Sequence, residues 1–297
     1  MKGYFLLALL PVCILCCVSA ELVSNEVRVK DSSGRDTSGK VRYHHDAATA
    51  CATVVMIGVG TAMTVGDYEA LSADISTDSS IVTLITDHNS GFFVKLQWRQ
   101  YRSFYNNVVS SISDIVPACK GKNPKIIVGG HSASGQAVID AMAEDKKARE
   151  DNKNIENRTL IRKPDGFIGL DPFRINTNVE IDAELPVLVW GFSATTCSVS
   201  VDQAAKAAYT KSSKDHRVFY KIMNSAKNIK HCAFTDAGCG IACGKDKGGE
   251  WVHRTVAKSI QVFSNAVKTG SFPNSQFQAA LERPLEEVQM FFNGYHF

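Results

Sequence analysis

Runs of consecutive hydrophobic residues alternate along the chain with segments in which hydrophobic residues recur at helical spacing. The hydrophobic runs lie at residues 51–60, 80–87, 125–130, 165–173, 185–193 and 216–223. Continuous runs of this length predict strands that are buried on both faces of a sheet. The segments with helical spacing lie at residues 67–76, 104–116, 136–148 and 252–267. In the last segment, hydrophobic residues repeat at intervals of three and four, which is typical of an amphipathic helix.

The alternation of strands and helices predicts one α/β architecture, a mostly parallel central sheet with helices on both faces. Residues 21–50 are more polar, and we expect short strands around residues 26–30. The highly charged residues 143–166 indicate a long solvated loop. Because parallel sheets bind ligands beyond the carboxyl ends of their strands, the residues directly after each strand are the candidates for chemistry.

The first twenty residues have the pattern of a secretory signal. One early lysine precedes an apolar stretch over residues 4–18, and small residues end the segment at Ala20. The alternative is a membrane anchor, but the apolar stretch is shorter than the roughly 20 residues that a span needs. We therefore expect cleavage after Ala20 and a single secreted domain over residues 21–297, without a membrane span.

Composition narrows the classes of function further. The net charge is +3, and acidic and basic residues are interspersed, so the sequence does not indicate a nucleic-acid partner. Six of the nine cysteines follow the signal, at positions 51, 119, 197, 232, 239 and 243. An even number in an exported chain favours disulfides over a metal site. The spacing of the last three matches no zinc pattern, and Asn157 begins a sequon for N-glycosylation.

The segment "IIVGGHSASGQAVIDAM" joins a predicted strand to a predicted helix through a small-residue turn around Ser132. It approaches the G-x-S-x-G pattern, in which a serine is exposed on a strained strand-to-helix turn. Gly130 fits this pattern, Ser134 stands where the second glycine is expected, and a glycine follows at Gly135. Ser132 is therefore the candidate nucleophile.

Two further residues complete a candidate triad. Asp171 follows the predicted strand at residues 165–170, and His231 lies on a loop before the last long helix. The order Ser132, Asp171, His231 is that of a hydrolase triad, in which the carboxylate orients the general base. Asp202 is a rival for the acid, although it lies farther from a strand end.

A tetrahedral intermediate also needs two hydrogen-bond donors for its oxyanion. One predicted donor is the backbone N–H of Ala133, directly after the serine. The other is expected on the loop after the first core strand, where Val59 and Gly60 are the candidates.

Together, "GGHSASG", "GLDPF" and "KHCAFTD" resemble the chlorophyllase and platelet-activating-factor acetylhydrolase-like branch of the α/β-hydrolases. The similarity covers roughly residues 51–267. The resemblance implies an α/β-hydrolase fold with Ser132 as nucleophile, Asp171 as acid and His231 as base. The chain departs from that branch at Ser134, and at "IGVG", where the branch usually has His-Gly.

The leading hypothesis is a secreted serine hydrolase that cleaves carboxylic esters of small molecules or lipids and needs no metal or organic cofactor. One alternative is a catalytically inactive protein that uses the same fold for binding. Another is a peptidase on the same fold.

Overall fold

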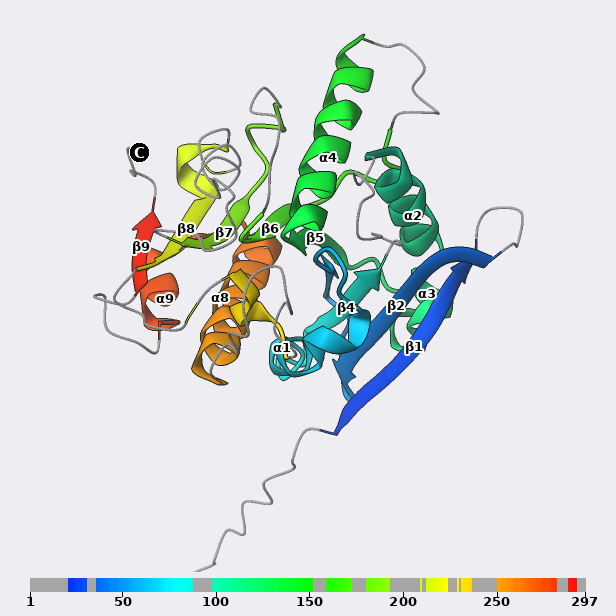
Figure 1. Cartoon of the computed structure of the whole chain (residues 1–297), viewed down its shortest axis with the longest axis horizontal. Coiled ribbons are helices and arrows are strands. Elements are labelled where there is room, and N and C mark those ends of the chain that lie inside the picture. The colour runs from blue at the N-terminus through cyan, green and yellow to red at the C-terminus, as the bar shows by residue number, and fades with distance from the viewer. Residues whose placement is uncertain are drawn as a thin grey trace, which may run out of the picture.

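The structure is a computed structural model of the chain (Figure 1). It describes residues 21–30, 36–87, 98–151, 159–172, 180–192, 209, 212–223, 229, 231–236, 250–281 and 288–292. The predicted signal, Asn157, Asp202, Cys197, Cys239 and Cys243 lie outside the described residues.

Nine strands form one sheet in the order β1-β2-β4-β3-β5-β6-β7-β8-β9. Their bounds are β1 Leu22–Lys30, β2 Asp36–Asp46, β3 Thr53–Gly58, β4 Ile81–Asp87, β5 Lys125–His131, β6 Gly166–Leu170, β7 Val187–Phe192, β8 Arg217–Ile222 and β9 Val288–Phe292. The pairings from β4 to β8 are parallel, and those of β1 with β2, β2 with β4 and β8 with β9 are antiparallel. The sheet is therefore mostly parallel, as predicted.

Helices cover both faces of this sheet (Figure 1). The α-helices are α1 Glu69–Ile75, α2 Trp98–Ser110, α3 Ile112–Ile115, α4 Ala133–Asp151, α8 Glu250–Thr269 and α9 Asn274–Ala279. Short 3₁₀ turns are η1 Val65–Tyr68, η2 Pro117–Cys119, η3 Lys214–His216 and η4 His231–Phe234. Helices α2 and α4 pack together on one face, and α1 and α8 pack together on the other.

Strand β3 shows why the central runs are continuously hydrophobic. Val54 and Met56 pack in the core beneath α2 and α4, whereas Val55 and Ile57 pack in the core beneath α1 and α8. Successive side chains of a strand point to opposite faces, and both faces here are covered. Each of these side chains is almost fully buried.

Three segments differ from the sequence-based prediction. Strand β2 is a full strand of 11 residues, and β9 was not predicted. Helix α4 continues to Asp151, which confirms the helical spacing predicted to residue 148 and shows that the loop predicted over residues 143–166 was wrong for residues 143–151. The i,i+4 ion pairs Lys146–Glu150 and Asp145–Arg149 stabilise the polar last turns of α4.

A disulfide joins Cys51, just before β3, to Cys119 in η2, just before β5. It confirms one of the disulfides that the cysteine count predicts. Cys232 is disulfide-bonded as well.

Candidate active site

Ser132 lies between the last residue of β5 and the first residue of α4, with no loop in between. Its φ is 55°, in the left-handed region that only a minority of non-glycine residues adopt. The turn is tight enough to exclude side chains on its inner side. A Cβ added at Gly130 would lie 2.5 Å from the nitrogen of Gly135 and 2.6 Å from the carbonyl carbon of Ser134. Glycine at position 130 is thus a steric requirement of the turn.

Ser134 fits this turn because of a second glycine on the neighbouring strand. A Cβ added at Gly58, the last residue of β3, would lie 2.7 Å from the Cβ of Ser134, so Gly58 leaves the room that the serine occupies. The Ser134 hydroxyl is fully buried and donates a hydrogen bond to the carbonyl oxygen of Val59. Serine at this position therefore ties the turn to the loop after β3.

Asp171 directly follows β6 and also has a positive φ, of 44°. Its N–H donates to the carbonyl oxygen of Trp190 on β7, and its side chain is fully buried. Because His131 on β5 pairs with Leu170 on β6, the next residues, Ser132 and Asp171, leave the sheet at the same edge.

His231 begins the turn η4 and meets Asp171 although 60 positions separate them. The Nδ1 of His231 lies 2.6 Å from Oδ2 of Asp171. A carboxylate only accepts, so Nδ1 carries the hydrogen and Nε2 of the neutral ring keeps a lone pair. The ring is 7% exposed and lies 4.6 Å from the ring of His131, centroid to centroid. The described Ser132 hydroxyl and His231 ring are not hydrogen-bonded to each other.

The predicted oxyanion donors differ in their surroundings. Ala133 is the first residue of α4, so its N–H has no partner within the helix. The N–H of Val59 donates to Thr86 at 3.0 Å, and the N–H of Gly60 donates to the Tyr68 hydroxyl at 2.8 Å.

The exposed residue Thr61 follows directly after Gly60. Within the described part of the chain, no hydrogen bond engages its N–H. Sequence reasoning did not single out Thr61, because only the structure shows which amides of this loop are already bonded.

Two buried residues beneath the site also went unrecognised. The Nε2 of His131 lies 2.9 Å from the carbonyl oxygen of His231, and its Nδ1 lies 2.7 Å from the Tyr68 hydroxyl. Burial, and then the neighbouring His231, hold the pKa of His131 well below its usual value. Burial likewise raises the pKa of Tyr68. Both side chains are therefore neutral.

The segment after His231 is fixed by its own side chains. The Phe234 ring packs edge-on against the rings of His131 and Phe192. The Asp236 carboxylate accepts a hydrogen bond from the N–H of Ala70 in the first turn of α1, at 3.0 Å. These contacts hold the His231 loop against both the turn and α1.

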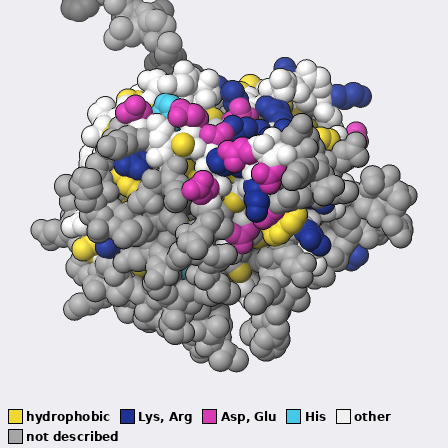
Figure 2. All heavy atoms as spheres, turned by 90° about the horizontal axis from the view of Figure 1, so that it is seen from above, with side chains coloured by type: hydrophobic (Ala, Val, Ile, Leu, Met, Phe, Trp, Pro, Cys, Tyr) yellow, Lys and Arg dark blue, Asp and Glu magenta, His cyan; other side chains and the backbone are white. Residues whose placement is uncertain are grey.

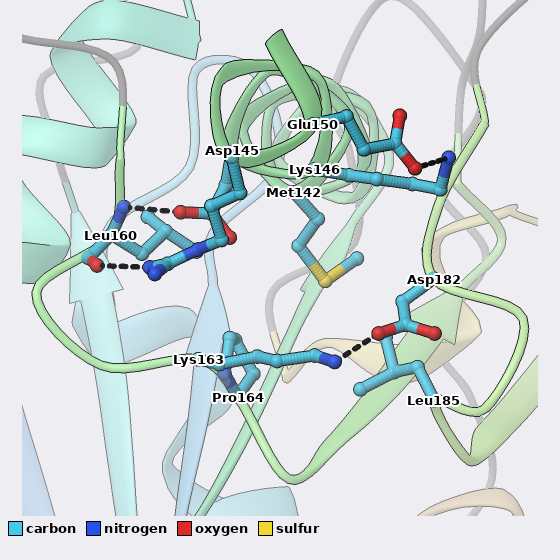
Figure 3. Close-up of a pocket in the computed structure, with 10 residues that line it drawn as sticks. Met142, Asp145, Lys146, Glu150, Leu160, Lys163, Pro164, Asp182 and Leu185 are labelled. Carbon is cyan, nitrogen blue, oxygen red and sulfur yellow. Dashed lines mark hydrogen bonds and ion pairs between the residues drawn. The ribbon is translucent and has the colours of Figure 1, made fainter. Parts of the chain in front are cut away.

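A pocket lies at the other end of α4 (Figure 3). It is lined by hydrophobic Met142, Leu160, Pro164 and Leu185 and by charged Asp145, Lys146, Arg149, Glu150, Lys163 and Asp182. Met142 is ten positions beyond Ser132, which on an α-helix corresponds to about 15 Å. The charged residues pair with one another, as Lys163 and Asp182 do in Figure 3. The pocket is thus separate from the Ser132 site.

The surface view in Figure 2 shows acidic and basic side chains mixed over the described part of one face. Among the described residues, no group of three or more histidine, cysteine or acidic side chains is arranged to hold a metal ion. None of the described helices is both long and apolar enough to cross a membrane.

Comparison of the sequence with protein-family models and with curated proteins gave no match.

Proposed function

We propose that the protein is a serine hydrolase that cleaves carboxylic esters of small molecules or lipids, on an α/β-hydrolase fold. The observation that carries the proposal is the buried Asp171–His231 pair, with Nδ1 and Oδ2 2.6 Å apart, beside a serine in a strained strand-to-helix turn. The resemblance of the three motifs to the chlorophyllase and acetylhydrolase-like branch supports it.

In the proposed reaction, the Ser132 oxygen attacks the ester carbonyl carbon while its proton passes to Nε2 of His231. Asp171 keeps the hydrogen of His231 on Nδ1, so Nε2 is free to accept this proton. The Ala133 N–H at the start of α4 and an N–H of the loop at residues 59–61 hold the oxyanion. When the tetrahedral intermediate collapses, the C–O bond to the alcohol breaks and the alcohol takes the proton from His231.

Water then hydrolyses the acyl group bound to Ser132 in two similar steps. His231 accepts a proton from the water as its oxygen attacks the acyl carbon, and returns that proton to the Ser132 oxygen as the acyl bond breaks. The products are a carboxylic acid and the free enzyme, and no step needs a cofactor.

A binding protein without activity is the second candidate. It is favoured by the engaged N–H groups of Val59 and Gly60 and by the lack of a hydrogen bond between Ser132 and His231. Catalytic hydrogen bonds often tighten only when substrate is bound, so these observations weigh less than the Asp171–His231 pair.

A fluorophosphonate probe separates the two functions, because it reacts with an activated serine. We expect the probe to label the wild-type protein and not Ser132→Ala. If the wild type neither labels nor hydrolyses a short-chain p-nitrophenyl ester, the enzyme proposal is wrong.

The acid is tested by two substitutions. Asp171→Asn is expected to lower kcat by about 10⁴-fold, because His231 would lose the partner that fixes its tautomer. Asp202→Asn is expected to leave kcat nearly unchanged. The reverse pattern would transfer the role of acid to Asp202.

We also propose that the protein is secreted and that its signal ends at Ala20. The Cys51–Cys119 disulfide supports this proposal, since such bonds persist in oxidising compartments. N-terminal sequencing of protein recovered from the medium of expressing cells is expected to begin at Glu21. Retention of residues 1–20 in membranes would favour an anchor instead.

A further inference from the structure

A chain of hydrogen bonds runs beneath the candidate site from the loop after β3 to the backbone of His231. A carbonyl oxygen only accepts, so the Nε2–H of His131 donates to the His231 carbonyl, at 2.9 Å. The Nδ1 of the neutral His131 ring then accepts from the Tyr68 hydroxyl, at 2.7 Å. The Tyr68 oxygen in turn accepts from the N–H of Gly60, at 2.8 Å. Every donor in this chain points in one direction.

The surroundings of this chain of hydrogen bonds favour the neutral form of His131. His131 and Tyr68 are fully buried. A second proton on His131 would occupy Nδ1, and the Tyr68 hydroxyl would be left with a weak acceptor, the Sδ of Met63 at 3.3 Å. Among the described residues, the titratable groups that face the His131 ring are Tyr68 from η1 and His231 from η4, and neither is a carboxylate. The Phe234 ring and the loop at Gly60 also pack against the His131 ring, and a Cβ added at Gly60 would lie 2.9 Å from Nδ1.

We propose that His131 is a positioning residue for His231 and that the Tyr68 hydroxyl fixes the tautomer it needs for this role. The proposal rests on the proposed function, in which His231 is the base. Asp171 orients the His231 ring through Nδ1, and His131 holds the backbone of the same residue through its carbonyl. The same link connects the base to the loop that is expected to supply an oxyanion donor.

Two amide substitutions separate the two nitrogens of His131. The amide of His131→Gln reaches the place of Nε2 and can donate to the His231 carbonyl. The shorter amide of His131→Asn ends near the place of Nδ1, so it can accept from Tyr68 and cannot reach that carbonyl. We expect kcat of His131→Gln to stay within about threefold of the wild type and that of His131→Asn to fall about tenfold or more. KM is expected to change less than about twofold in both, because positioning of the base acts on the chemical step.

A merely structural histidine would give a different pattern. Equal losses in the two variants, or no loss in either, would overturn the proposal. Tyr68→Phe provides a second test if His131→Asn does not fold, because it removes the hydroxyl that fixes the His131 tautomer. We expect Tyr68→Phe to lower kcat. The matched control is Tyr105→Phe on α2, which removes a hydroxyl bonded to the carbonyl of Arg162 and should not lower kcat. Equal kcat values for these two variants would likewise overturn it.

Nitrogen-15 NMR of the histidine rings tests the chain of hydrogen bonds without measuring enzyme turnover. We expect His131 of the wild type to remain neutral with its hydrogen on Nε2 from about pH 8 to about pH 5, below the usual histidine pKa. In Tyr68→Phe, its Nδ1 resonance should shift toward that of an unbonded nitrogen. Titration of His131 near its usual pKa, or a hydrogen on Nδ1, would overturn the proposal. A wild type that shows the expected resonances and does not react with the fluorophosphonate would refute the proposed function and leave this chain of hydrogen bonds established.

Discussion

At position 134 the chain carries serine where a G-x-S-x-G turn has its second glycine. The structure accommodates the serine by placing Gly58 opposite its Cβ and the Val59 carbonyl within reach of its hydroxyl. The substitution therefore does not leave a crowded turn or an unsatisfied polar group. It adds a bond between the turn that carries Ser132 and the loop expected to supply an oxyanion donor.

Ser134→Ala tests this bond. The change keeps the Cβ and leaves the buried Val59 carbonyl without this donor, so we expect the free energy of unfolding to fall by about 1–2 kcal/mol. Urea unfolding measures it. The matched control is Ser110→Ala, which removes an exposed hydroxyl bonded to Asn106 on α2 and should change stability by about 0.5 kcal/mol or less. Equal effects of the two changes would show that the Ser134 bond is unimportant.

Gly58→Ala tests the steric half of the same arrangement. The new methyl group would lie 2.7 Å from the Cβ of Ser134, and we expect a loss of about 1–3 kcal/mol from overpacking. Ser134→Gly removes the opposing Cβ. Gly58→Ala should therefore cost less stability in the Ser134→Gly background than in the wild type. A double-mutant cycle in urea measures the coupling, and strictly additive losses would contradict the contact.

At the scale of elements, the hydrophobic pattern predicts the strands that are buried on both faces and does not predict those that are partly exposed. Every central strand from β3 to β8 was predicted, because each is a continuous hydrophobic run between two helical layers. Strand β2 was not predicted, because its buried residues include polar side chains that are satisfied by partners on α1. Its His44 is nearly fully buried and is bonded to Ser72 and Glu69 of α1, a tertiary arrangement that no local pattern predicts.

The residues of the candidate site likewise fall into those that the sequence predicts and those that only the structure shows. Ser132 and Asp171 could be singled out because each directly follows a predicted strand. The roles of His131 and Tyr68 could not be predicted, since 63 positions separate them and only the packing of η1 against the end of β5 brings them together. The state of the Gly60 N–H depends on the same packing.

The Cys51–Cys119 disulfide links the amino ends of β3 and β5 and spans 68 positions. Loop-closure entropy predicts that a link of this length stabilises the folded chain by about 4 kcal/mol. We expect the double variant Cys51→Ala, Cys119→Ala to lose about this much in urea without reductant. Cys232 keeps its own disulfide in both proteins, so that bond does not contribute to the difference in stability. A midpoint unchanged from the wild type would show that the two elements need no covalent link.

In the molecule as a whole, the residues at the carboxyl ends of the central strands differ from those near their amino ends. The carboxyl ends of β5 and β6 carry Ser132 and Asp171 on strained backbone. Near the amino ends of β6 and β7, the pocket beside α4 is lined by charges that pair with one another. Strain and a buried histidine–carboxylate pair cost stability, and such features are characteristic of functional sites rather than of structural ones.

The buried His131 should make the stability of the whole molecule depend on pH. Its pKa in the folded protein is well below the usual 6.5, so below about pH 6.5 the unfolded chain binds a proton that the folded protein does not. Stability therefore rises with pH in this window and is lost as the pH falls, by about 1.4 kcal/mol per pH unit from this group.

His131→Gln removes this contribution. Urea unfolding of both proteins between about pH 7 and about pH 5 should show the wild type losing more stability than the variant, by about 1.4 kcal/mol per unit once the pH is below the usual histidine pKa. The histidines that do not contact the His131 ring have the same surroundings in both proteins, so their contributions cancel in the difference. Parallel curves would mean that His131 titrates normally in the folded protein. In that case Nδ1 of His131 would take up a proton near the usual histidine pKa, the Tyr68 hydroxyl could no longer donate to it, and the chain of hydrogen bonds would be broken there.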